Sequence, residues 1–155
     1  MAKTARQLRV LVVDDHYDSE EALARLLRLC GYTVFEAFSG ATAFSIAVNL
    51  LPDIIITDVN MPGVNGIELT EMIRSDPVAR RIPIVTITAQ GRSALRAARK
   101  AGADVTMEKP LDFENLLNDI EVLTRASHSR AQNGAHPSSG SCSTGSSFPN
   151  PDFHR

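Results

Sequence analysis

The chain has 155 residues, of which 43% are hydrophobic, and its formal net charge at pH 7 is −2. This nearly balanced charge argues against a protein that binds nucleic acid directly through an overall basic surface. The longest apolar runs are far shorter than the ~20 residues of a membrane-spanning helix, and the run after the basic N-terminus ends too early for a signal peptide. These features predict a cytoplasmic protein that makes no contact with a membrane.

The two cysteines agree with that location. Cys30 ends an apolar helical pattern and is expected to be a buried thiol, whereas Cys142 lies in the polar C-terminal segment. One buried thiol and one thiol in a loose segment form no disulfide framework.

Segments typical of strands and of helices alternate five times over residues 8–125. The strand-like segments are short runs rich in Val and Ile, as expected for strands that are buried on both faces. The helix-like segments carry apolar residues at helical spacing; Gly31, Pro52 and Gly102 end three of them, and Asp112 caps the last. In chain order, the expected elements are a strand at 8–13, a helix at 19–30, a strand at 33–37, a helix at 40–51, a strand at 53–57, a helix at 67–74, a strand at 82–87, a helix at 92–101, a strand at 103–107 and a helix at 112–125.

Residues 126–155 differ in composition from the rest of the chain. They are rich in Ser, Gly, Pro and Asn, with two aromatic residues and no apolar periodicity. Such a segment cannot bury enough apolar surface to offset its conformational entropy. We therefore expect a short extension at 1–7, one domain at 8–125 and a disordered tail at 126–155.

Strict alternation of strands and helices predicts an α/β fold with a parallel sheet covered by helices on both faces. Right-handed crossovers leave few topologies for five such strands. A doubly wound, flavodoxin-like sheet in the order 2-1-3-4-5, with five helices, is the expected solution.

Polar residues follow four of the predicted strands, at the edge where such folds bind ligands. Asp14 and Asp15 follow the first strand, Asp58 the third, Thr88 the fourth, and Lys109 the fifth. Three carboxylates in one cleft repel one another, so a cation is expected there. Oxygen ligands suit Mg²⁺, with Mn²⁺ as the alternative ion. A carboxylate beside such an ion can attack phosphorus and become an aspartyl phosphate.

The four edge segments read VLVVDD, IIITDVNMPGVNG, VTITA and EKP. In this order they resemble the receiver domains of two-component response regulators, over roughly residues 8–125. The resemblance assigns the following roles by position: phosphoacceptor, Asp58; metal site, Asp14, Asp15, Asp58 and the backbone carbonyl of Asn60; phosphoryl binding and switching, Thr88, Ala89 and Lys109; structural, Pro110, usually reached through a cis peptide bond.

The resemblance also implies a function and partners. A histidine kinase or histidine phosphotransfer protein would donate the phosphoryl group, and an unknown downstream protein would receive the signal through contact or onward phosphotransfer. Because no further domain follows residue 125 in this sequence, we expect a single-domain regulator, as a monomer or a phosphorylation-dependent dimer. Its only chemistry would be self-directed phosphoryl acceptance and autodephosphorylation, so it would not be an enzyme in the usual sense.

The predicted fourth helix carries a row of basic residues, Arg92, Arg96, Arg99 and Lys100, which recur at helical spacing. Such a row is commonly a solvated face. In the family it resembles, this helix belongs to the face that partners read, so the row is also a candidate docking surface. Thr106 on the fifth strand belongs to the same candidate face and stands where most receivers carry Tyr or Phe. A Thr has no ring to bury on activation, so signal transmission is expected to differ here.

Two other functions are compatible with the same site residues. A pseudo-receiver would be a docking module that never takes phosphate. A phosphatase or phosphotransferase with an aspartyl phosphate commonly carries a second acid two residues after the nucleophile, where this chain has Asn60. His16 follows the acid pair and is expected to be a solvent-facing loop or helix-start residue near the metal, with no role in the mechanism.

Overall fold

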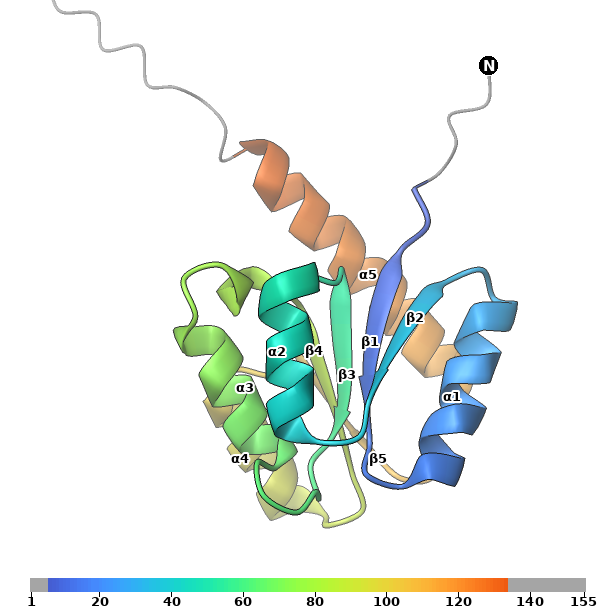
Figure 1. Cartoon of the computed structure of the whole chain (residues 1–155), viewed down its shortest axis with the longest axis vertical. Coiled ribbons are helices and arrows are strands. Elements are labelled where there is room, and N and C mark those ends of the chain that lie inside the picture. Colours follow the sequence, from blue (N-terminus) through green and yellow to red (C-terminus); the bar gives the residue numbers. More distant parts are fainter. Residues whose placement is uncertain (1–5, 134–155) are drawn as a thin grey trace, which may run out of the picture.

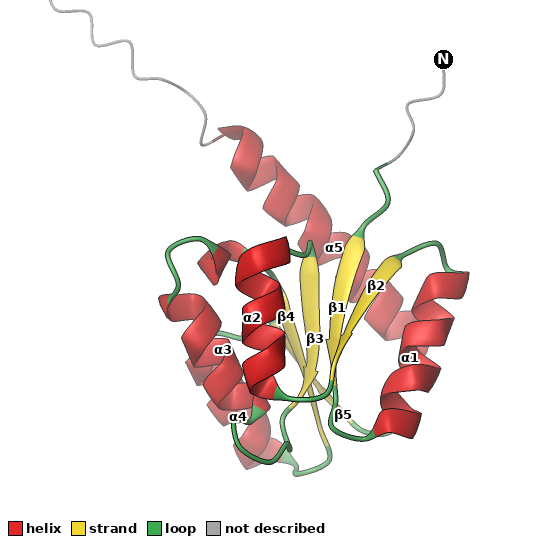
Figure 2. Cartoon of the chain, viewed as in Figure 1, coloured by secondary structure: helices red, strands yellow, loops and turns green. Residues whose placement is uncertain are grey.

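The computed structural model describes residues 6–133. They form a five-stranded sheet in the order β2-β1-β3-β4-β5, and every neighbouring pair of strands is parallel. Helices cover both faces of the sheet (Figures 1 and 2), which confirms the predicted fold. The strands are β1 Arg9–Val13, β2 Thr33–Ala37, β3 Ile54–Asp58, β4 Ile84–Thr88 and β5 Val105–Glu108; the helices are α1 Tyr17–Leu29, α2 Gly40–Leu50, α3 Gly66–Ser75, α4 Arg92–Ala101 and α5 Phe113–Asn133, with a 3₁₀ turn, η1, at Ala79–Arg81.

The apolar core consists of two clusters, one on each face of the sheet. Alternate residues of β1 belong to the two clusters in turn, because successive side chains of a strand point to opposite faces of the sheet. Leu11 packs with the cluster that α2 and α3 cover, and Val12 with the cluster that α1 and α5 cover. All five residues of β3 are buried, which explains why its sequence begins with three isoleucines before Thr57 and Asp58.

Helix α5 is longer than the sequence predicts. We expected it to end at about Arg125, but it continues to Asn133 and extends beyond the amino edge of the sheet (Figure 1). The prediction of disorder from residue 126 onward is therefore wrong for residues 126–133. These residues include Ala, Arg and Gln, which favour helices, and no Gly or Pro occurs before Gly134. The rest of the predicted tail, 134–155, lies outside the described residues.

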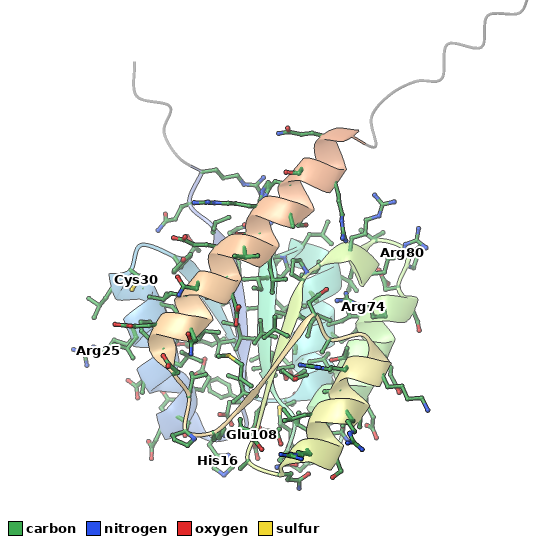
Figure 3. The ribbon with its side chains drawn as sticks, turned by 180° about the vertical axis from the view of Figure 1, so that it is seen from behind. His16, Arg25, Cys30, Arg74, Arg80 and Glu108 are labelled. Carbon is green, nitrogen blue, oxygen red and sulfur yellow. The ribbon has the colours of Figure 1, made fainter. Side chains whose placement is uncertain are left out.

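Cys30 also differs from its expected environment, because its thiol is exposed rather than buried. Helix α1 ends at Leu29, and Cys30 is its C-cap, in the turn that leads to Gly31. The buried face of α1 is formed instead by Glu20, Ala24 and Leu27. In the view from behind, Cys30 lies at the far end of α1 from His16 (Figure 3).

No helix among the described residues is long and apolar enough to cross a membrane.

Candidate functional site

The carboxyl ends of the strands are held together by the backbone itself. Strand order reverses between β1 and β3, so the residues after these two strands flank the crevice at the switch point. Hydrogen bonds from Val59 N to Ile87 O (2.9 Å) and from Lys109 N to Thr88 O (2.9 Å) tie the strand ends to one another. The fold thus brings Asp58 at the end of β3 to the same edge as the polar residues that follow β1 and β5.

Three of the predicted acids meet at this edge. Donor atoms of Asp14, Asp15, His16 and Asp58 all lie within 4.8 Å of one another. Asp58 is 5% exposed and Asp14 is 8% exposed, so both carboxylates are largely removed from water. Oxygen Oδ1 of Asp15 is buried and has no hydrogen-bond partner among the described residues. A buried carboxylate oxygen without a donor is a feature that a bound cation would satisfy.

Lys109 provides the positive charge at the site. Its Nζ lies 3.3 Å from Asp58 Oδ2, which makes an ion pair between the end of β5 and the end of β3. The Lys109–Pro110 peptide bond is cis. Asp58 Oδ1 accepts a hydrogen bond from the backbone N–H of Asn60 at 3.3 Å, so both carboxylate oxygens already have a partner.

Two further predicted site residues, Thr88 and Ala89, lie at the end of β4. Thr88 is fully buried, and its Oγ1 accepts a hydrogen bond from Gln90 N at 3.0 Å. No hydrogen bond joins Thr88 to Asp58 in the described part of the chain, and Ala89 is exposed. The Thr88 hydroxyl is therefore engaged with Gln90 rather than with Asp58.

The site also contains an acid that the sequence analysis missed. Glu20 of α1 is 1% exposed, and it lines a cavity of about 20 Å³ together with Asp14, Asp58 and Lys109. Its Oε1 has no hydrogen-bond partner among the residues described. Helical spacing places position 20 on the same face as Ala24 and Leu27, so periodicity alone could have shown that this Glu is buried.

Burial raises the pKa of Glu20 to about 7, and the negative charge of Glu36 adds to the effect, while Arg28 opposes it. A carboxyl whose pKa is higher in the folded chain than in the unfolded chain takes up its proton more readily when folded. Its protonation therefore favours folding at low pH, and this contribution is lost as the pH rises from about 4.5 through about 7.

Replacing Glu20 by Gln is expected to remove this pH dependence. Between pH 4 and pH 8, without divalent cations, the wild type should lose up to about 3 kcal/mol of unfolding free energy relative to Glu20→Gln, since each pKa unit corresponds to about 1.4 kcal/mol. Urea unfolding of both proteins at each pH measures the difference. A difference that stays constant across this range would show that Glu20 does not titrate as described.

Comparisons with known proteins identify the family. The model of the response regulator receiver domain matches residues 10–121. Response regulator PleD of Caulobacter vibrioides is 39% identical over 118 residues, which are 76% of this chain and 26% of that protein. Response regulator MprA of Mycobacterium ulcerans is 37% identical over 119 residues, or 76% of this chain and 50% of that protein. This chain thus spans between about a quarter and a half of these two relatives.

Solved structures agree with the sequence matches. A putative response regulator from Chloroflexus aurantiacus has a TM-score of 0.74 at 35% identity, over 77% of this chain and 99% of that chain. The chemotaxis response regulator CheY4 of Vibrio cholerae has a TM-score of 0.70 at 29% identity, over 76% of this chain and 98% of that chain. With the acidic pocket at the carboxyl edge of its sheet, this chain belongs to the family of response regulator receiver domains, which are signalling modules of two-component systems.

Proposed function

We propose that this chain accepts a phosphoryl group on Asp58 from the phosphohistidine of a histidine kinase or of a histidine phosphotransfer protein. The observation that carries the proposal is the position of Asp58: a nearly buried carboxylate with Lys109 Nζ at 3.3 Å and with oxygens of two further aspartates within 4.8 Å. Membership of the receiver family implies a cognate histidine kinase as the partner.

The donor set fits the magnesium ion that receiver chemistry requires. Asp14, Asp15 and Asp58 supply carboxylate oxygens, the ligand type that Mg²⁺ prefers, and the unpartnered Asp15 Oδ1 is free to bind it. The backbone carbonyl of Asn60 is proposed as a further ligand, with Mn²⁺ as the alternative ion. When bound, such an ion neutralises the charge that develops on the transferring oxygens.

In the transfer step, an oxygen of Asp58 forms a bond to phosphorus while the bond between phosphorus and the donor imidazole nitrogen breaks. The bonding electron pair leaves with the imidazole, which takes up a proton. Lys109 remains next to the new acyl phosphate, where its positive charge pairs with a phosphoryl oxygen. Hydrolysis then adds water to phosphorus, releases inorganic phosphate and restores the Asp58 carboxylate.

Signalling is proposed to follow from a change of partner at Thr88. In this structure its hydroxyl accepts from Gln90 N. In the phosphorylated chain the hydroxyl turns to donate to the phosphoryl group, which Ala89 and Lys109 also contact. This shifts the segment after β4 and biases an existing two-state equilibrium. Gly91, with a φ of 75°, follows in the same segment and is the proposed hinge.

A small phosphodonor tests the proposal without the partner kinase. Intact-mass measurement after incubation with phosphoramidate should show one added phosphoryl group when Mg²⁺ is present and none when EDTA is present. Absence of labelling under both conditions would favour a phosphate-independent docking module instead. Steady turnover of unrelated phosphoesters would favour a phosphatase.

We also propose that the basic face of α4 is a docking surface for an acidic partner. Arg92, Arg96, Arg99 and Lys100 are all exposed, and none of them forms an ion pair within residues 6–133. Arg99 Nε donates to Thr106 Oγ1 at 3.3 Å, so α4 and β5 are linked where most receivers carry an aromatic ring. A shift of α4 would therefore be transmitted through this bond rather than through burial of a ring.

Neutralising the face should weaken partner binding. A triple change of Arg92, Arg96 and Arg99 to Gln is expected to reduce affinity for the kinase that labels the chain fastest by roughly tenfold, since exposed charges contribute up to about 1 kcal/mol each. The measurement is titration calorimetry at two salt concentrations.

The matched control is a triple Gln variant of Arg25, Arg80 and Arg130, which are exposed on other elements. It has the same net charge as the α4 variant and should bind the kinase more tightly than the α4 variant does. Equal affinities for the two variants would remove the proposed docking role of α4.

A further inference from the structure

His16 contributes its ring nitrogen to the acid cluster of Asp14, Asp15 and Asp58. Its Nδ1 is 3.1 Å from Asp15 Oδ1 and 3.4 Å from Asp14 Oδ1. The ring itself is 69% exposed, and it stands at the carboxyl edge of the sheet, at the N-cap of α1 (Figure 3). The convergence of its ring nitrogen with two carboxylates needs an explanation, because the residue pattern around His16 indicates no role for it.

One long hydrogen bond does not account for both contacts. Asp15 Oδ1 remains without a hydrogen-bond partner although Nδ1 is only 3.1 Å away, because the two groups are not aligned as donor and acceptor. Nδ1 does form a hydrogen bond with Asp14 Oδ1, but it is long at 3.4 Å, and that oxygen already accepts from the backbone N–H of His16 at 2.9 Å. The atoms are close together but are not held by good hydrogen bonds.

The spacing of these atoms is that of ligands on a common ion. Two donors, each bound at about 2.1 Å, lie about 3.0 Å apart in octahedral geometry and about 3.4 Å apart in tetrahedral geometry. The observed separations of 3.1 Å and 3.4 Å fall within this range. Asp58 adds a donor within 4.8 Å of the others, so one ion can reach all four side chains after small side-chain movements.

Building on the proposed metal site of this receiver, we propose that His16 Nδ1 is a fourth side-chain ligand, beside the three aspartates, and that it favours first-row transition-metal ions there. Neutral imidazole is a good ligand for Co²⁺, Ni²⁺ and Zn²⁺, whereas Mg²⁺ selects oxygen. The three carboxylates are enough for Mg²⁺. His16 therefore adds affinity for transition-metal ions without adding affinity for Mg²⁺. It makes the site prefer Co²⁺, Ni²⁺ or Zn²⁺ over Mg²⁺ more strongly than the three aspartates alone would.

The test compares Co²⁺ and Mg²⁺ binding to the full chain and to His16→Gln. The variant should bind Co²⁺ at least about tenfold more weakly, which is the scale on which ligand-shell changes act, while its Mg²⁺ affinity should change less than about twofold. Proton NMR of the Co²⁺-loaded wild type should show paramagnetically shifted imidazole signals that saturating Mg²⁺ removes and that His16→Gln lacks.

A matched control is His128→Gln, because His128 is half-exposed on α5 and its Nε2 faces Asp53 rather than the pocket. It should keep the wild-type Co²⁺ affinity and signals. Equal Co²⁺ affinity of wild type and His16→Gln, or an equal loss of Co²⁺ and Mg²⁺ affinity, would overturn the role of His16 while leaving the proposed function intact. A wild type that binds neither ion would instead remove the metal site and the proposed function together.

Discussion

Asp58→Asn is expected to accept no phosphoryl group from any donor, while the fold is retained. An amide oxygen is a poor nucleophile, and its phosphoryl adduct has no stable form. Asp58 is nearly buried and pairs with Lys109 and with the backbone N–H of Asn60. An Asn side chain fits the same space, and removing one of several converging negative charges relieves repulsion in the pocket. Thermal unfolding should therefore show a protein at least as stable as the wild type.

Intact-mass measurement with phosphoramidate and Mg²⁺ reports the loss of acceptance. The control is Asp18→Asn, in the exposed first turn of α1, which changes the same charge close to the pocket without touching it. Asp18→Asn should be labelled like the wild type. Labelling of Asp58→Asn to the wild-type extent would mean that another residue accepts the phosphoryl group.

Gly66→Ala is expected to destabilise the chain by about 3 kcal/mol or more, because the new methyl group has no space. A Cβ at this first residue of α3 would lie 2.2 Å from the carbonyl oxygen of Asp58 and 2.8 Å from Val59 Cα. Both are backbone atoms at the end of the central strand. Relief of the clash would move Asp58 itself, so phosphoryl acceptance should fall together with stability.

Gly63→Ala is the matched control in the same loop. Gly63 has a φ of 73°, but nothing lies within 4 Å of its added Cβ. The cost there is only that of a left-handed backbone conformation for Ala, roughly 1–2 kcal/mol. Urea unfolding separates the two effects. A Gly66→Ala variant as stable as Gly63→Ala would show that α3 does not press against the end of β3 as described.

The fold and the acid cluster could be predicted because both follow from local patterns. Continuous Val and Ile runs identify buried parallel strands, and parallel strands necessarily bring their carboxyl ends to one edge. Asp14, Asp15 and Asp58 therefore had to meet once the strand order was known. The ion pair between Lys109 and Asp58 follows from the same topology, with β5 at the edge of the sheet beyond β4.

What was missed depends on side-chain directions and on local composition. The orientation of the Thr88 hydroxyl toward Gln90 N is decided by a loop hydrogen bond that no periodicity predicts. The convergence of His16 Nδ1 with two carboxylates likewise requires coordinates. The extension of α5 to Asn133 is not evident from composition, because residues 126–133 are followed by a longer segment rich in Ser, Gly and Pro that dominates the composition of 126–155.

The most direct test of the account locates the phosphoryl group in the wild-type chain. After incubation with phosphoramidate and Mg²⁺, borohydride reduction converts an aspartyl phosphate to homoserine, and peptide mass spectrometry identifies the position. Homoserine is expected at position 58, in amounts that rise with the phosphodonor concentration and vanish with EDTA. Homoserine at another position, or stable phosphate on a hydroxyl or imidazole side chain, would contradict the assignment of Asp58 as the acceptor.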